Sequence, residues 1–298
     1  MKTTTWLTSL AVVLAMTACG TAADLEGEGG DEAPQRLVIG SQDYYSNEIL
    51  AEVYAQALEA AGHPVDRQLR IGQREVYIPD LQVGRIDVFP EYSGNLLQHH
   101  IPGTTARLPQ DVATELAVAL PEGLRALEFA PATDQDSYVV TKEFAEQHGL
   151  SSIADLADVD GVVLGGNSEL ETRPYGPKGL AELYGVEVTF TPVEDSGGAL
   201  TVKALRSGTV NLVDIYSADP VLTDPDLVVL EDPKGLFLTS NVVPVVSDKV
   251  DAKAEAVLNK VSAAMSPEDL RGMNQRSVTD QAPAATIAAD WLKSEGLA

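Results

Sequence analysis

Two tyrosines stand directly behind runs of apolar residues, where each predicted strand gives way to a turn. Tyr92 closes the run Val88-Phe89-Pro90-Glu91, and Tyr216 follows Leu212-Val213-Asp214-Ile215. Because Pro90 has no amide N–H and a fixed φ, we expect the first strand to stop before it and to leave Tyr92 in a rigid turn. A ring held in this way is typical of the wall of a ligand site. The alternative is an ordinary half-buried ring.

The elements around Tyr92 are predicted to be three strands that alternate with two helices. Apolar runs ending near Gly or Pro indicate strands, and a repeated apolar face indicates helices. In an open α/β sheet of this order, ligands bind beyond the carboxyl ends of the strands, so residues 41–45 and 90–95 should share one rim. The predicted strands are 36–40, 65–71 and 84–89, and the predicted helices are 46–61 and 73–82.

The second half of the chain repeats this alternation with different spacing and without an exact sequence repeat. The predicted strands are 138–141, 162–164, 186–192, 210–216, 227–231 and 242–246. The predicted helices are 142–148, 152–157, 178–184, 199–207, 253–265 and 284–295. Alternation of this kind favours the α/β class in both halves.

The first 33 residues predict export and tethering. An apolar run too short to span a bilayer precedes Cys19, the chain's only cysteine, so residues 1–18 are interpreted as a signal peptide. The segment resembles a bacterial lipoprotein signal, in which Cys19 is lipidated. The alternative is an ordinary cleaved signal. Residues 19–33 are rich in acids and glycine and are predicted to be a disordered tether.

The remaining segment, about 265 residues from Pro34, is long enough for two lobes of ordinary size. The formal net charge of −25 argues against binding to nucleic acid or to anionic lipid. The same charge is compatible with a cationic ligand, or simply with a solvated acidic surface. With a single cysteine, the fold has no internal disulfide, so its core must hold it together.

Several segments together resemble the substrate-binding proteins of glycine betaine/carnitine/choline ABC transporters. Among them are Ile39-Gly40-Ser41, Arg74-Glu75-Val76, Thr172-Arg173-Pro174 and Val228-Val229-Leu230-Glu231-Asp232, besides the stretches that contain Tyr92 and Tyr216. The resemblance implies a two-lobe Venus-flytrap of the type II periplasmic binding proteins, each lobe a mixed sheet flanked by helices. Two crossovers are expected near residues 132–136 and 238–242. Lobe I would comprise residues 34–134 plus 241–298, and lobe II residues 135–240.

The resemblance also implies a ligand and a site. A quaternary ammonium has no N–H to donate, so aromatic faces bind it, and Tyr92 and Tyr216 fall on cage positions. Arg173 could hold a ligand carboxylate, or it could form a salt bridge between loops. The cage departs from the family pattern at residues 132–136 and at Ser240, where tyrosines are frequent. The other candidate ligand-binding residues are Ser41, Gln42, Asp43, Tyr44, Tyr77, Ser93, Asn95, Asp136, Tyr175 and Asn241.

The partners implied are a small quaternary amine or zwitterion, an ABC permease and, through the lipid anchor only, the membrane. We expect a monomer without cofactor, metal or catalytic residue. Two alternatives remain, a different zwitterionic metabolite or amino-acid derivative as ligand, and a secreted hydrolase. His99 and His100, predicted to lie in a loop, are a weak metal signal, and no nucleophile elbow or His-Glu-x-x-His helix occurs.

Overall fold

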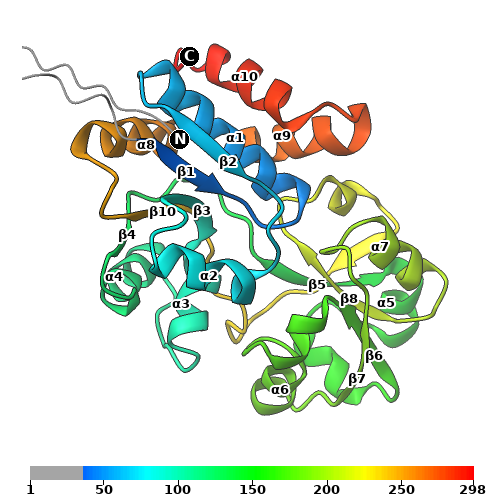
Figure 1. Ribbon diagram of the computed structural model, residues 1–298. Helices are drawn as coiled ribbons and strands as arrows, with labels where there is room; N and C mark the ends of the chain where they lie inside the picture. Colours follow the sequence, from blue (N-terminus) through cyan, green and yellow to red (C-terminus); the bar gives the residue numbers. More distant parts are fainter. Residues whose placement is uncertain (1–35) are drawn as a thin grey trace, which may run out of the picture. The chain divides into compact units, whose positions relative to one another are not determined.

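The computed structural model describes residues 36–298, which form two five-stranded mixed sheets flanked by helices (Figure 1). The predicted fold class is confirmed. The predicted signal peptide, Cys19 and the tether lie outside the described residues.

The first sheet has the strand order β2 (Val65–Gln68), β1 (Leu37–Gly40), β3 (Val88–Tyr92), β10 (Val242–Ser247) and β4 (Leu124–Ala126). β1 is parallel to β2 and β3, whereas β10 runs antiparallel to β3 and β4. Its core lies on both faces. One face packs on α1 (Tyr45–Ala60), α8 (Ala252–Ala264), α9 (Pro267–Asp280) and α10 (Ala284–Ser294), and the other on α2 (Arg74–Gln82), α3 (Ser93–His100) and α4 (Pro109–Ala119). Figure 1 shows α10 lying beside α1.

The second sheet repeats this arrangement with the order β7 (Val188–Pro192), β6 (Val162–Gly166), β8 (Leu212–Tyr216), β5 (Asp136–Thr141) and β9 (Leu227–Val229). β6 is parallel to β7 and β8, and β5 is antiparallel to β8 and β9. The helical segments of this half are α5 (Lys142–His148), η1 (Ile153–Asp158), η2 (Ser168–Thr172), α6 (Pro177–Gly179), η3 (Leu180–Tyr184), α7 (Ala199–Arg206) and η4 (Pro220–Thr223).

The predicted end of the strand before Pro90 is wrong, because β3 continues through Pro90 to Tyr92. Pro90 lies opposite Pro244 in the antiparallel ladder with β10. Neither residue has an N–H, so this is a position where the ladder needs no donor. The Pro90 carbonyl accepts a hydrogen bond from Asn47 Nδ2 at 2.9 Å. Tyr92 is therefore the last residue of a buried strand and the N-cap of α3.

Six elements were missed by the periodicity of apolar residues, namely α3, α4, β4, η2, η4 and α9. In α9 only Leu270, Met273 and Asn274 are buried, so its apolar stripe is too narrow to stand out. His99 and His100 are the last residues of α3, which corrects the loop predicted for them.

The chain crosses between the sheets twice, after β4 and before β10, and the two crossing segments pair with each other. Thr133 forms an antiparallel bridge with Asn241. The Asp134 amide donates to the Ser240 carbonyl, and the Val242 amide to the Ala132 carbonyl, both at 3.0 Å. The predicted crossovers are thus located, while the exact lobe boundaries stay a prediction.

Gly94 at the start of α3 packs directly on the returning crossover. A Cβ at this position would lie 2.7 Å from both Leu238 Cβ and Ser240 Oγ. Only glycine allows this approach, which brings the start of α3 against the segment that joins the sheets.

Candidate ligand-binding site

Side chains from both sheets enclose a cavity of about 50 Å³. The first sheet and its loops contribute Gln42, Tyr44, Tyr92 and Asn95, and the second contributes Asp136, Arg173, Tyr175 and Tyr216. The rim shared by residues 41–45 and 90–95 is present, since the Gln42 amide donates to Asn47 Oδ1 at 2.8 Å and Asn47 in turn binds Pro90.

Three tyrosine rings cluster at the cavity, with Tyr44 between the other two. The Tyr44 centroid lies 5.2 Å from that of Tyr216 and 6.4 Å from that of Tyr92. Tyr92 belongs to β3 and Tyr216 to β8, so the rings come from different sheets. Burial raises the pKa of all three phenols, which keeps them neutral. The Tyr92 hydroxyl has no hydrogen-bond partner among residues 36–298.

A buried ion pair holds Tyr92 in place from behind. Arg74 donates to both oxygens of Glu91 at 2.8 Å, and the Tyr92 amide donates to Glu91 Oε2 at 2.9 Å. Burial would raise the pKa of Glu91, but the Arg74 guanidinium overcomes this effect and holds it below the usual range. The Tyr77 hydroxyl also donates to Glu91. Tyr92 is therefore fixed by a charged network under the strand end.

Three buried aspartates line the cavity beside the rings, Asp134 in the first crossover, Asp136 on β5 and Asp214 on β8. Asp134, Asp136 and Asp214 are 5%, 5% and 8% exposed. Asp136 on β5 lies opposite Tyr216 on β8, and Asp214 on β8 lies opposite Tyr138 on β5. Residues two apart on a strand share a face, so carboxyl and phenol groups alternate on one face of this sheet.

The environment of Asp134 and Asp214 favours their protonated forms. Burial raises the pKa of Asp134 to about 8, despite the hydrogen bond that it accepts from the Ala218 amide at 2.9 Å. Burial and then the neighbouring Asp136 carboxylate raise the pKa of Asp214 well above its usual range. Asp214 Oδ1 has no hydrogen-bond partner in the described part of the chain. The cavity thus contains buried carboxyl groups to which the described residues supply few hydrogen bonds.

Arg173 lines the cavity, but a carboxylate of the protein already holds it. Its terminal nitrogens Nη1 and Nη2 lie 2.6 and 3.1 Å from the two oxygens of Glu75 on α2. The salt bridge that was the alternative for Arg173 is present, and it joins the two halves of the chain. The ligand-carboxylate role stays a prediction.

Asn95 makes a second connection between the halves. Its Nδ2 donates to Asp136 and to the Tyr175 hydroxyl, the latter at 3.1 Å. Its Oδ1 accepts a hydrogen bond from Ser240. Ser240, one of the positions that depart from the family pattern, therefore binds Asn95 at the cavity wall.

The other predicted residues do not line the cavity. Tyr77 is stacked on Phe89 with ring centroids 3.8 Å apart. Asn241 donates to the Ala130 carbonyl at 2.8 Å, and the Ser93 hydroxyl accepts from the Asn241 amide at 3.0 Å. Ser41 accepts from the Arg70 amide at 2.8 Å, and Asp43 from Gln73 at 3.2 Å. These residues support the loops around the site.

Several cavity residues were not predicted, namely Gln73, Arg74, Asp134, Asn167, Glu169, Leu170, Ser196, Gly197 and Asp214. Asp214 carried a signal, because a carboxylate in the middle of the run Leu212-Val213-Asp214-Ile215 is costly to bury without a partner. Gly197 has φ of +79°, and a Cβ there would lie 3.1 Å from the Asp214 carbonyl oxygen.

The described residues contain no cluster of three or more His, Cys, Asp or Glu side chains that could hold a metal ion. His99 and His100 lie with ring centroids 5.1 Å apart, and burial lowers the pKa of both. Across residues 36–298 the structure also has no helix that is both long and apolar enough for a membrane span.

The chain belongs to the family described as the substrate-binding domain of the ABC-type glycine betaine transport system, whose model matches residues 35–294. Its members are substrate-binding proteins of ABC transporters rather than enzymes, and the resemblance found in the sequence is confirmed.

Two curated relatives are similar over most of this chain. The glycine betaine-binding protein YehZ of Escherichia coli (strain K12) is 24% identical over 287 residues, which cover 89% of this chain and 92% of YehZ. The ergothioneine transport permease/ergothioneine binding protein EgtU of Helicobacter pylori (strain G27) is 24% identical over 267 residues, or 88% of this chain. This chain spans only about half of EgtU, 48%.

A solved structure of a glycine betaine/carnitine/choline ABC transporter protein shares the fold. It superimposes with a TM-score of 0.68 at 19% identity, covering 88% of this chain and 99% of the other. The two-lobe periplasmic-binding-protein fold is thus the fold of residues 36–298.

Proposed function

We propose that this chain captures a quaternary ammonium solute between its two lobes and delivers it to an ABC permease. The observation that carries the proposal is the cluster of Tyr44, Tyr92 and Tyr216, in which rings from both sheets meet at an acid-lined cavity. The family and its relatives, which include a glycine betaine-binding protein, support the same class of ligand.

The ring cluster suits a cation that cannot donate hydrogen bonds. The negative face of each aromatic ring attracts such a cation by about 0.5–2 kcal/mol, and the attraction is greatest where water is excluded. Tyr44, Tyr92 and Tyr216 are all less than half exposed, and the first two are 8% and 4% exposed. A cation among these rings would therefore be largely desolvated.

Binding is coupled to lobe closure in this proposal. Glu75 and Arg173 join the lobes on one side of the cavity, and the Tyr45 hydroxyl donates to Asp219 at 2.8 Å on another. Because the rings are buried in this arrangement, a ligand can enter only when these contacts open. The paired crossovers supply the hinge.

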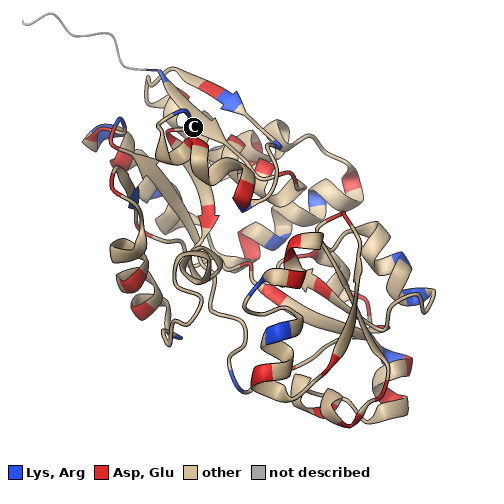
Figure 2. Cartoon of the chain, turned by 60° about the horizontal axis from the view of Figure 1, so that its bottom comes forward, with Lys and Arg blue, Asp and Glu red and all other residues tan. Residues whose placement is uncertain are grey.

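We further propose that the protein works outside the cytoplasm as a monomer, anchored through lipidated Cys19 and the tether 19–33. Lobes would comprise residues 34–134 plus 241–298 and residues 135–240. Figure 2 shows Asp and Glu distributed over both lobes with fewer Lys and Arg among them, which is consistent with an anchor that does not depend on attraction to anionic lipid.

The test compares Ala and Phe at each ring position. Titration calorimetry with choline and with glycine betaine should show a five- to thirtyfold loss for Tyr44→Ala, Tyr92→Ala and Tyr216→Ala with whichever solute binds, about 1–2 kcal/mol. The Phe variants keep the ring face and should retain most of the affinity.

Tyr184→Phe is the matched control, because this ring is 6% exposed and packs in the core of the second lobe, away from the cavity. Its affinity should be that of the wild type. Ala variants that bind like the wild type, or a wild type that binds neither solute, would contradict the proposal.

A further inference from the structure

We propose that the ligand is a net cation without a carboxylate, an amino-alcohol type of quaternary ammonium, and that Asp134, Asp136 and Asp214 select it over zwitterionic betaines. This inference rests on the proposed function and narrows its substrate class.

The cavity has no unpaired positive group to receive a ligand carboxylate. Among the residues that line it, Arg74 and Arg173 are the only Lys or Arg side chains. Arg74 is held by Glu91 through two hydrogen bonds at 2.8 Å, and Arg173 by Glu75 through bonds at 2.6 and 3.1 Å. Each guanidinium is thus neutralised by its own carboxylate.

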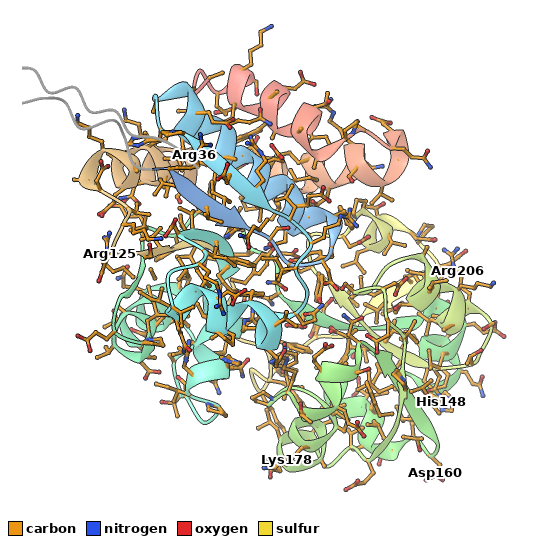
Figure 3. The ribbon with its side chains drawn as sticks, in the orientation of Figure 1. Arg36, Arg125, His148, Asp160, Lys178 and Arg206 are labelled. Carbon is orange, nitrogen blue, oxygen red and sulfur yellow. The ribbon has the colours of Figure 1, made fainter. Side chains whose placement is uncertain are left out.

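The other Lys and Arg side chains of residues 36–298 do not line the cavity. Figure 3 shows Arg36, Arg125, Lys178 and Arg206 on the outside of the fold. Their side chains are 59%, 40%, 79% and 51% exposed, and none of them lines the cavity. Solvent and salt screen such charges from a buried site.

The three aspartates of the cavity, in contrast, have no cationic partner among the described residues. Asp134, Asp136 and Asp214 are each more than nine-tenths buried, and they lie beside phenols and one another's carboxyls, with Asp219 next to Asp134. Asp134 accepts from the Ala218 amide, and Asp136 from the Asn95 side chain. The cluster is therefore an excess of buried carboxyl groups that no free cation of the cavity lining compensates.

Two buried polar atoms without partners face this cavity. They are Asp214 Oδ1 and the Tyr92 hydroxyl, on residues 8% and 4% exposed, and no hydrogen bond within residues 36–298 reaches either. Buried polar atoms are normally paired, so these two point to a ligand with a polar group. The Tyr92 hydroxyl can donate or accept, so it is Asp214 Oδ1 that favours a donor at the ligand's second end. A hydroxyl or amine at the ligand's second end would satisfy Asp214.

A carboxylate at the ligand's second end would meet the opposite situation. It would add a further negative charge at close range to a site of low effective dielectric in which the carboxyls already raise one another's pKa. Repulsion at this range should lower the binding constant of such a ligand by more than about tenfold. Amino-alcohol cations and zwitterionic betaines share the trimethylammonium head, so the group at the ligand's second end determines which of the two classes binds more tightly.

The experiment uses choline and glycine betaine as a matched pair, because they share the trimethylammonium head and differ at the other end. Calorimetry on the wild-type chain should give at least tenfold tighter binding of choline. Asp214→Asn and Asp136→Asn should each weaken choline at least fivefold while leaving glycine betaine unchanged or tighter. Asn at either position keeps an acceptor oxygen, so the contact from Asn95 to residue 136 can persist.

Asp160→Asn is the control, since Asp160 is an exposed surface carboxylate at the far edge of the second lobe (Figure 3). It should leave both affinities as in the wild type. The comparison of choline with glycine betaine on the wild-type protein requires no variant, so it tests this inference even if a variant fails to fold. Equal or tighter binding of glycine betaine by the wild type overturns this inference alone. Failure of both solutes overturns the proposed function with it.

Discussion

Asp134→Asn should make the unliganded protein more stable than the wild type as the pH rises. The carboxyl is 5% exposed, and burial raises its pKa to about 8. Its surroundings are acidic or neutral, since Asp136, Asp219 and the phenols of Tyr44 and Tyr92 lie nearby. Asn is a neutral isostere whose oxygen can still accept from the Ala218 amide.

The direction of this pH dependence of stability follows from the pKa of Asp134 in the native and in the unfolded state. The unfolded carboxyl loses its proton near pH 4, whereas native Asp134 keeps it to about pH 8. Between these values the native state binds the extra proton, so this group's contribution to stability falls as pH rises. The slope is about 1.4 kcal/mol per pH unit for one proton, which gives about 3 kcal/mol between pH 5 and pH 7.5.

The assay is urea unfolding of wild type and Asp134→Asn at pH 5 and pH 7.5, with Asp160→Asn as the control. His99 and His100 act in the opposite direction, because burial lowers their pKa and their neutral forms gain stability as pH rises. The difference between wild type and variant removes this background. The variant should gain about 3 kcal/mol relative to wild type over the window.

A difference between wild type and variant that stays constant within about 0.5 kcal/mol from pH 5 to pH 7.5 would refute the reasoning, since Asp134 would then titrate alike in both states. Saturating choline provides an independent check. A bound cation favours the ionised carboxyl, so choline should flatten the wild-type pH dependence.

Two further predictions concern closure and anchoring. Glu75→Gln should weaken solute binding by roughly two- to fivefold without a change at the rings, because a partly exposed ion pair that joins the lobes contributes about 0.5–1 kcal/mol. Calorimetry measures the affinity of this variant and of the surface control Glu268→Gln. An unchanged affinity of Glu75→Gln would exclude a role of this ion pair in closure. Cys19→Ser should release the protein from carbonate-washed membranes with its melting temperature unchanged, as fractionation and circular dichroism would show; a variant that stays bound would contradict the lipid anchor.

The fold class could be predicted from the sequence because the central strands are buried along most of their length. Runs such as Val242–Ser247 are buried at every residue and leave no other interpretation. The strand end predicted at Pro90 was wrong because a proline ends a strand only where its neighbour in the sheet needs an N–H donor from it. That neighbour is Pro244, and the sequence alone does not show this pairing.

The site could be predicted only in part for a similar reason. Tyr92 and Tyr216 were found because both follow apolar runs. The contact between Glu75 and Arg173 joins residues 98 apart, on different lobes, and no local pattern encodes it. Asp214 was detectable in principle, since an acid within a buried strand is expensive unless it has a task.

The pairing of the two crossovers has a mechanical consequence. Segments around Thr133 and Asn241 form a short two-stranded ribbon instead of two independent threads. A ribbon flexes readily out of its plane but resists shear and twist, because these would stretch its hydrogen bonds. In the closure proposed above, the lobes would then be restricted to one arc of approach, along which Tyr92 and Tyr216 would meet at the same separation each time. A permease that recognises the closed form would then encounter the same shape with every solute.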